Sequence, residues 1–334
     1  MSEPIELKAV RLAGRAVGKV QQGADVMARA RATTRFPYRS PSIPRGVEVV
    51  AKERKTGVEF DTAWARKDAG RMARALIVEG PLRLLVKGVA RPEVVGLDRL
   101  NDLMEGDYQP VVFAANHHSH LDAPLMITSI PAPWRHRLVV GAAADYFFST
   151  RFTGALSALT LNAIPIERTK VNRRSAELAT SLLAEGWSLV IFPEGGRSPD
   201  GWGQPFRGGA AFLSVRTGAP VVPVHLEGTG AVFGKGMKRP KPGPTRVTFG
   251  APMWPDPDDD ARSFGARIER AVAVLGDEAT SDWWTARRHA ASATTPALTG
   301  PAATTWRRAW ALADRRGRGR AAERRRQKRT WPKI

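Results

Sequence analysis

The chain has 334 residues and a net charge of +20, from 52 Lys and Arg against 32 Asp and Glu. Hydrophobic residues make up 43% and charged residues 25% of it, a composition that excludes disorder throughout the chain. The absence of cysteine excludes disulfides, thiolate metal sites and cysteine nucleophiles, and it fits a reducing compartment.

The positive charge is concentrated at the two ends of the chain. Residues 1–60 carry 12 Lys and Arg and 6 Asp and Glu, residues 61–280 carry 26 and 23, and residues 281–334 carry 14 and 3. The net charges are therefore +6, +3 and +11. Basic ends favour polyanionic partners, either an anionic membrane or a nucleic acid. We expect a basic N-terminal extension over 1–60, a folded domain over 61–280, and a linker with an Arg-rich tail over 281–334.

Neither a membrane span nor a signal peptide is expected. A spanning helix needs about 20 apolar residues, and the uncharged run 152–166 is shorter and contains Gly154, Asn162 and Pro165. The first ten residues, MSEPIELKAV, contain acidic side chains and lack the apolar core of a signal peptide.

Residues 61–90 have a helical pattern that Gly80-Pro81 interrupts. After this break, Leu82, Leu85, Val86 and Val89 form one apolar stripe at helical spacing. Arginines and a lysine surround the stripe. It predicts either a helix that packs on the core or a helix that lies in the plane of an anionic membrane, near residues 70–90.

Short apolar runs then alternate with helix-length segments. The expected strands are 111–115, 138–142, 163–166, 188–192, 221–226 and 246–250, and the expected helices include 173–185, 208–216 and 261–275. Such alternation predicts an α/β fold with a central, mainly parallel or mixed sheet flanked by helices. The basic N- and C-terminal extensions lie outside this domain.

A polar cluster, NHHSHLD over residues 116–122, directly follows the first of these strands. Ligands of open α/β sheets bind just beyond the carboxyl ends of strands. On one continuous helix, His117 and Asp122 would point about 140° apart. A strand–turn–helix geometry, with Ser119 as the helix N-cap and Asp122 in the first turn, can bring them together.

Two other interpretations of this cluster stay open at this point. Ser119-x-x-Asp122 resembles a capping box, in which Asp122 would only cap the helix. Alternatively, His117, His118 and His120 could bind a metal ion, although adjacent histidines rarely converge on one metal.

A second cluster, FPEGGRS over residues 192–198, also lies at the end of an expected strand. Its two glycines let backbone N–H groups approach a ligand closely, and Arg197 offers a planar guanidinium that suits phosphate. The alternative is an ordinary Gly-rich turn with a surface arginine. Two further arginines lie next to expected elements: Arg168 ends the segment IPIER, which contains an expected strand, and Arg207 precedes the expected helix 208–216.

Together these segments resemble the glycerophospholipid acyltransferase family, the 1-acylglycerol-3-phosphate acyltransferases. NHHSHLD matches the N-H-x-S-x-x-D block of the family, and IPIER, FPEGGRS and VVPV (221–224) resemble its next three blocks in the same order. The resemblance covers residues 76–250. One position departs from it, because Gly196 stands where the family usually has Thr, so a hydroxyl that could touch phosphate is absent.

The resemblance implies an O-acyltransferase that moves a fatty acyl group from acyl-CoA or acyl carrier protein to a hydroxyl of a lysophospholipid. The expected acceptor is 1-acylglycerol-3-phosphate, and the expected product is phosphatidic acid. His117 would be the general base, and Asp122 would fix the tautomer of its ring and stabilise the imidazolium. Backbone N–H groups around Gly195 and Gly196 would hold the acceptor or the oxyanion.

The remaining site residues are assigned to the acceptor. Arg168, Arg197 and Arg207 would bind the acceptor phosphate, and Glu194 would position the acceptor or an arginine. Neither a metal ion nor another cofactor is expected.

Because both substrates are amphiphiles, we expect a cytoplasmic enzyme that binds peripherally to the anionic inner face of the membrane. Two alternatives stay open. One is an acyltransferase for another lipid, glycolipid, ornithine-type lipid or polyketide hydroxyl. The other is a basic nucleic-acid-binding protein, which the nearly balanced middle of the chain disfavours.

Overall fold

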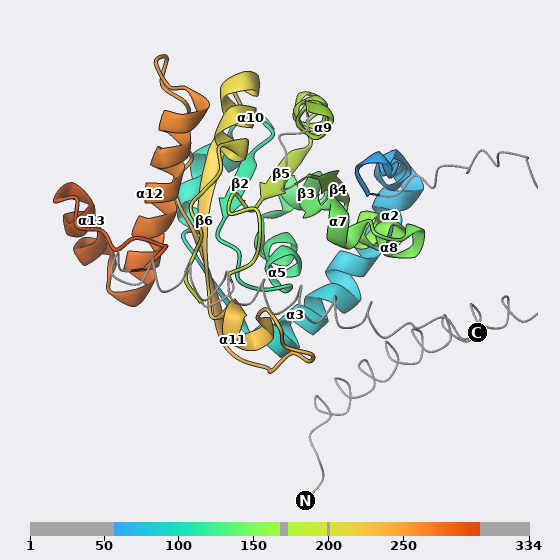
Figure 1. The fold of residues 1–334 in the computed structure, drawn as a ribbon, viewed down its shortest axis with the longest axis horizontal. Coiled ribbons are helices and arrows are strands. Elements are labelled where there is room, and N and C mark those ends of the chain that lie inside the picture. The colour runs from blue at the N-terminus through green and yellow to red at the C-terminus, as the bar shows by residue number, and fades with distance from the viewer. Residues whose placement is uncertain (1–56, 168–172, 199–200, 301–334) are drawn as a thin grey trace, which may run out of the picture. The chain divides into compact units, whose positions relative to one another are not determined.

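The computed structural model describes residues 57–167, 173–198 and 201–300, which form a seven-stranded sheet covered by helices (Figure 1). The sheet order is β1-β7-β6-β2-β5-β3-β4. Its strands are β1 (Pro92–Val95), β2 (Val112–Ala115), β3 (Leu138–Ala143), β4 (Ala163–Ile166), β5 (Ser188–Ile191), β6 (Val221–Glu227) and β7 (Thr245–Phe249). The predicted α/β class and six predicted strands are thus confirmed.

Helices connect and cover these strands. The longer ones are α2 (Asp68–Ile77), α3 (Arg83–Ala90), α5 (Asp122–Ser129), α8 (Arg151–Leu161), α9 (Arg173–Ala184), α10 (Gly209–Thr217), α12 (Ala261–Thr280) and α13 (Trp283–Ala291). The shorter ones are α4 (Asn101–Glu105), α6 (Ala132–Arg135), α7 (Ala144–Phe147) and α11 (Thr229–Phe233). The 3-10 turns are η1 (Gly57–Glu59), η2 (Ala63–Arg66) and η4 (Leu97–Leu100), and η3 (Val78–Leu82) is a π-helical turn.

The central strand, β2, runs parallel to both of its neighbours, β5 and β6. Strands β3 and β4 continue the parallel arrangement, and only the pairing of β6 with β7 is antiparallel. All four residues of β2 are buried because helices cover both faces of the sheet. The carboxyl ends of β2, β4 and β5 therefore lie at the same edge of the sheet, where the loops that follow them can form one site.

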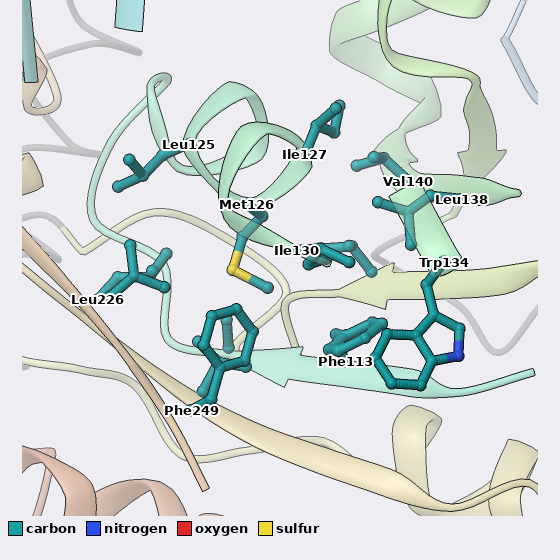
Figure 2. Close-up of a cluster of buried hydrophobic side chains, with 14 of the residues drawn as sticks. Phe113, Leu125, Met126, Ile127, Ile130, Trp134, Leu138, Val140, Leu226 and Phe249 are labelled. Carbon is teal, nitrogen blue, oxygen red and sulfur yellow. The ribbon is translucent and has the colours of Figure 1, made fainter. Parts of the chain in front are cut away.

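One face of the sheet packs against α3, α4 and α5. Figure 2 shows Met126 of α5 and Ile130, which directly follows this helix, pointing toward Phe113 of β2. The Phe113 ring meets the rings of Trp134 and Phe249 edge-on, with centroids 5.9 and 6.3 Å apart. These rings are almost fully buried, and the indole N–H of Trp134 donates to the Gln109 carbonyl at 3.0 Å. This cluster fixes α5 on the sheet, and with it the end of the loop that connects β2 to α5.

The other face packs against α9, α10 and α12 (Figure 1). Val112 and Ala114 of β2 point into this second cluster, whereas Phe113 and Ala115 point into the first. The alternation follows from the two-residue period of a strand.

Three predictions about elements need correction. Gly80-Pro81 does not end the helix, because η3 joins α2 to α3 without a break. Strand β1 was not predicted, because it begins with Pro92 and has only two apolar residues. Its partner strand, β7, is also distant in the sequence. Part of the expected linker forms α13, which begins at the capping residue Asp282 and packs on α12.

The apolar stripe of α3 packs mainly on the core. Val86 and Val89 are buried in the first cluster, Leu82 packs against it, and only Leu85 is exposed. The core-packing interpretation is therefore confirmed for this stripe, and Val86 and Val89 are not available to a membrane. Most of the expected N-terminal extension, the tail from residue 301 and Arg168 lie outside the described residues.

Candidate active site

The loop after β2 starts at a residue that is tied to the neighbouring strand. The Asn116 side chain donates to the Leu226 carbonyl at 2.9 Å and accepts from the Leu226 amide at 2.7 Å. Asn116 is buried, so both bonds are shielded from water. These two hydrogen bonds to β6 fix where the loop leaves the sheet.

His117 and Asp122 come together on this loop. Nδ1 of His117 lies 2.8 Å from Oδ2 of Asp122, although a continuous helix would have separated them. The Asp122 carboxylate is fully buried, whereas the His117 side chain is 20% exposed. The His117 ring also stacks on Phe192, with centroids 4.3 Å apart. The carboxylate side of the ring thus faces the protein interior, and the ring as a whole reaches the surface.

Asp122 also shapes the turn. Its Oδ2 accepts the backbone N–H groups of His118 and Ser119, each at 2.7 Å. Ser119 is not an N-cap of α5, which corrects the predicted capping role. Its hydroxyl instead donates to the Phe233 carbonyl at 2.8 Å and accepts the Leu121 N–H at 3.0 Å. Asp122 therefore both closes the turn and binds the ring of His117.

Glu194 joins the loop after β2 to the loop after β5. One carboxylate oxygen accepts the His117 N–H at 2.9 Å, and the other accepts the Gln204 N–H at 2.9 Å. Glu194 is buried. The Ser198 N–H donates to the His117 carbonyl at 2.8 Å, which adds a second link between the two loops. The structure thus places Glu194 against backbone groups of both loops.

Gly195 has a left-handed backbone conformation that favours glycine, and it lies against the guanidinium of Arg207. Its φ angle is +69°, and a Cβ atom there would lie 3.0 Å from Cζ of Arg207. The Arg207 N–H donates to the Pro193 carbonyl at 2.9 Å, which holds this arginine beside the loop. Gly196 accepts a bond from the Gln204 side-chain amide at 3.0 Å. Gly195, Gly196 and Arg207 therefore lie together at the loop that follows β5.

Arg197 faces an aromatic group on a third element. Its guanidinium lies 5.9 Å from the ring centroid of Tyr146 on α7, and this ring stacks on His120 with centroids 5.4 Å apart. Burial and, to a smaller extent, the nearby charge of Arg197 together lower the pKa of His120 to about 4. His120 is therefore neutral near pH 7. The contacts of Arg197, Tyr146 and His120 place the cation of Arg197 close to the loop that carries His117.

Tyr146 and Gln204 also belong to the site, although the sequence analysis did not single them out, and Phe192 was noted there only as the first residue of FPEGGRS. The contacts of these three residues with His120, Glu194 and His117 depend on how the loops are brought together, so the sequence pattern alone does not show them. In the described part of the chain, no three His, Asp or Glu side chains are arranged to hold a metal ion. Among the helices that the structure describes, none is long and apolar enough to cross a membrane.

Comparison with known proteins gives consistent matches. The family model described as Acyltransferase matches residues 91–227. A 1-acyl-sn-glycerol-3-phosphate acyltransferase of Cocos nucifera is 36% identical over 101 residues, which cover 30% of this chain and 32% of that protein. The human 1-acyl-sn-glycerol-3-phosphate acyltransferase alpha is 26% identical over 179 residues, which cover 52% of this chain and 61% of that protein. The match thus spans less than two thirds of either relative.

A solved structure is also similar. The crystal structure of the 1-acyl-sn-glycerophosphate (LPA) acyltransferase PlsC of Thermotoga maritima has a TM-score of 0.49 and 22% identity, and the match covers 66% of this chain and 84% of that chain. The region that the Acyltransferase family model matches contains both loops that Glu194 joins, and this part of the chain is similar to the 1-acyl-sn-glycerol-3-phosphate acyltransferases.

Proposed function

We propose that this protein transfers a fatty acyl group from acyl-CoA or acyl carrier protein to the free hydroxyl of 1-acylglycerol-3-phosphate, which yields phosphatidic acid. The observation that carries the proposal is the 2.8 Å contact between His117 Nδ1 and the buried Asp122 carboxylate. An aspartate that accepts from Nδ1–H leaves the lone pair of a neutral imidazole on Nε2. This arrangement is what a general base for a hydroxyl group requires.

The chemistry needs no nucleophile from the protein. Nε2 of His117 takes the proton of the acceptor hydroxyl while the hydroxyl oxygen attacks the carbonyl carbon of the thioester. The tetrahedral intermediate collapses, the C–S bond breaks, and the imidazolium returns the proton to the thiolate. The products are the ester and the free thiol of the donor. The buried Asp122 stabilises the imidazolium while it exists.

The acceptor phosphate is assigned to Arg197 and Arg207. Both lie on or against the loop of Gly195 and Gly196, which Glu194 joins to the loop of His117. Charge-assisted bonds of this kind contribute about 1.5–3 kcal/mol each. Arg168 is proposed for the same phosphate from its position after β4. Gly196 provides no hydroxyl there, so the arginines carry the recognition of phosphate.

We further propose that the protein contacts a lipid surface through α2 and α8, in place of the stripe of α3. These two helices pack together, and their exposed side chains include Met72, Leu76, Phe152 and Leu156, which are 51–76% exposed. Helix α8 follows α7, whose Tyr146 stacks on His120 beside the catalytic loop. An apolar face next to the site suits two substrates with long acyl chains. Arg71 and Arg151 flank it and favour anionic lipids.

The function is tested with the full-length protein and labelled acyl donors. Acyl-CoA and acyl carrier protein thioesters are offered with a panel of acceptors, and the products are identified by mass spectrometry. The panel contains 1-acylglycerol-3-phosphate, the same lipid without phosphate, other lysophospholipids and a glycolipid. We expect phosphatidic acid as the main product. Faster transfer to an acceptor without phosphate would contradict the assignment of Arg197 and Arg207.

A matched control separates catalysis from folding. His289 of α13 pairs with Asp277 of α12 at 2.7 Å, a second His–Asp contact outside the site. We expect His117→Ala to lower the rate of transfer by about 10²–10⁴-fold, and His289→Ala to leave it nearly unchanged. Full activity of the His117 variant would exclude it as the general base.

A further inference from the structure

We propose that residues 294–300, here called the C-terminal strap, are a positioning element of the active site. The sequence assigned them to a linker, but in the structure they return from α13 to the loop that follows the Gly-rich turn. The strap acts through residues 202–204 on Glu194, and so on His117. The expected effect of the strap on enzyme kinetics rests on the acyl transfer proposed above. Its expected effect on the order of residues 202–204 does not depend on that function.

The first contact joins Leu298 to Gly203. The Gly203 N–H donates to the Leu298 carbonyl at 2.8 Å. Gly203 is buried, and a Cβ atom there would lie 3.2 Å from both Cβ and the carbonyl oxygen of Leu298. The two backbones therefore meet at a distance that glycine permits.

The second contact joins Gly300 to Trp202. Gly300 is buried with φ at +80°, and a Cβ atom there would lie 2.6 Å from the Trp202 ring. The Gly300 N–H donates to the Ala297 carbonyl at 3.0 Å, which closes the strap into a turn. The Trp202 ring thus lies so close to Gly300 that a side chain there would clash with it.

Gln204, the next residue, connects these contacts to the catalytic loop. Its N–H donates to Glu194 at 2.9 Å, and its side-chain amide donates to the Gly196 carbonyl at 3.0 Å. The second oxygen of Glu194 accepts the His117 N–H. An unbroken path of backbone and carboxylate contacts therefore leads from Leu298 through Gly203, Gln204 and Glu194 to His117.

The path predicts which kinetic constant the strap controls. Gln204 holds Gly196, and Gly196 lies between the Gly195 and Arg197 positions proposed for the acceptor. Loosening residues 202–204 should therefore weaken acceptor binding more than donor binding. A displacement of about 1 Å in a group that positions the substrate can lower the reaction rate by up to about 10²-fold.

Two truncations isolate the strap. One chain ends at Gly300 and lacks only the Arg-rich tail, and the other ends at Ala293 and also lacks the strap, while both retain α13. We expect the shorter chain to have an acceptor KM about tenfold higher or more, with a nearly unchanged donor KM. Hydrogen exchange should accelerate at Gly203 and Gln204 but not in β2 and β5. Equal acceptor KM and equal exchange in the two chains would overturn the proposal.

A point variant tests the same contact in a full-length chain. Gly300→Ala places a methyl group on the Trp202 ring, whereas Gly218→Ala introduces the same left-handed strain at a position with open space. We expect the first to reproduce the kinetic and exchange changes of the shorter chain and the second to leave both unchanged. Identical behaviour of the two variants would contradict the strap. If the wild-type chain transferred no acyl group to any acceptor, the proposed function would fail, and the exchange data would still decide on the strap.

Discussion

One carboxylate oxygen of Asp122 binds both the ring of His117 and the turn that carries it. The oxygen lies 2.8 Å from Nδ1 of His117 and 2.7 Å from the N–H groups of the next two residues. The position of the imidazole and the conformation of its backbone therefore depend on the same buried group.

Asp122→Asn should lower kcat by about 10²–10⁴-fold, because an amide that donates to Nδ1 favours the wrong tautomer of the ring. The measurement is the steady-state rate with saturating donor and acceptor, together with thermal unfolding. Asp277→Asn removes the matching carboxylate of the α12–α13 pair and should cost stability without comparable loss of kcat. Similar kcat values for the two variants would contradict the role of Asp122.

Arg197→Ala should raise the acceptor KM far more than the donor KM, since a phosphate contact belongs to one substrate only. Arg216→Ala is the matched control, because Arg216 also lies over an aromatic ring, that of Phe212 on α10, outside the site. We expect no change of either KM in the control. An unchanged acceptor KM in the Arg197 variant would remove this residue from the phosphate site.

Binding to anionic vesicles should have two separable parts. Residues 301–334 carry 12 Lys and Arg and 2 Asp and Glu, a net charge of +10. A chain that ends at Gly300 should therefore bind more weakly at low salt, and the difference should shrink near 0.15 M salt, where charges are screened over about 8 Å. Vesicle co-sedimentation at two salt concentrations measures this. If truncation abolished binding to DNA and left vesicle binding intact, the tail would belong to a nucleic-acid function.

The apolar part of vesicle binding should depend on α2 and α8. Leu76→Ser and Phe152→Ser should weaken co-sedimentation at both salt concentrations, because apolar contacts are not screened. Phe212→Ser changes an exposed phenylalanine of α10 and serves as the control. Equal binding of all three variants would exclude α2 and α8 as the lipid contact.

Stability should fall as the pH is lowered from about 6.5 toward 4. Burial lowers the pKa of both His120 and His225 to about 4, so the unfolded chain binds these protons first. The contribution is complete above the unfolded pKa of about 6.5 and is lost as the pH falls toward the folded value. His120→Gln should flatten the pH dependence of the free energy of unfolding. The change stays well below the limit of about 1.4 kcal/mol per pH unit, since the ring is partly exposed.

Much of the fold could be predicted because its signals are local. The strands 163–166 and 221–226 are short apolar runs whose side chains are mostly buried on both faces of the sheet. Such runs can be recognised in the sequence without any tertiary information. Strand β1 and helix α13 lacked this signal, since β1 depends on pairing with β7 and α13 on packing against α12. The stripe of α3 was recognisable as apolar, but the helix pattern alone did not distinguish a core from a membrane.

His117 and Asp122 could be identified from the sequence alone, because they lie on one short segment directly after a strand. Their contact required only that the strand end just before His117 and that a helix begin at Asp122. The tertiary structure decided what surrounds this turn. Glu194 lies 77 residues from His117, and Leu298 lies farther still from the same loop. Contacts of this kind follow from the order of the strands and the path of the chain across the sheet, and neither leaves a periodic trace in the sequence.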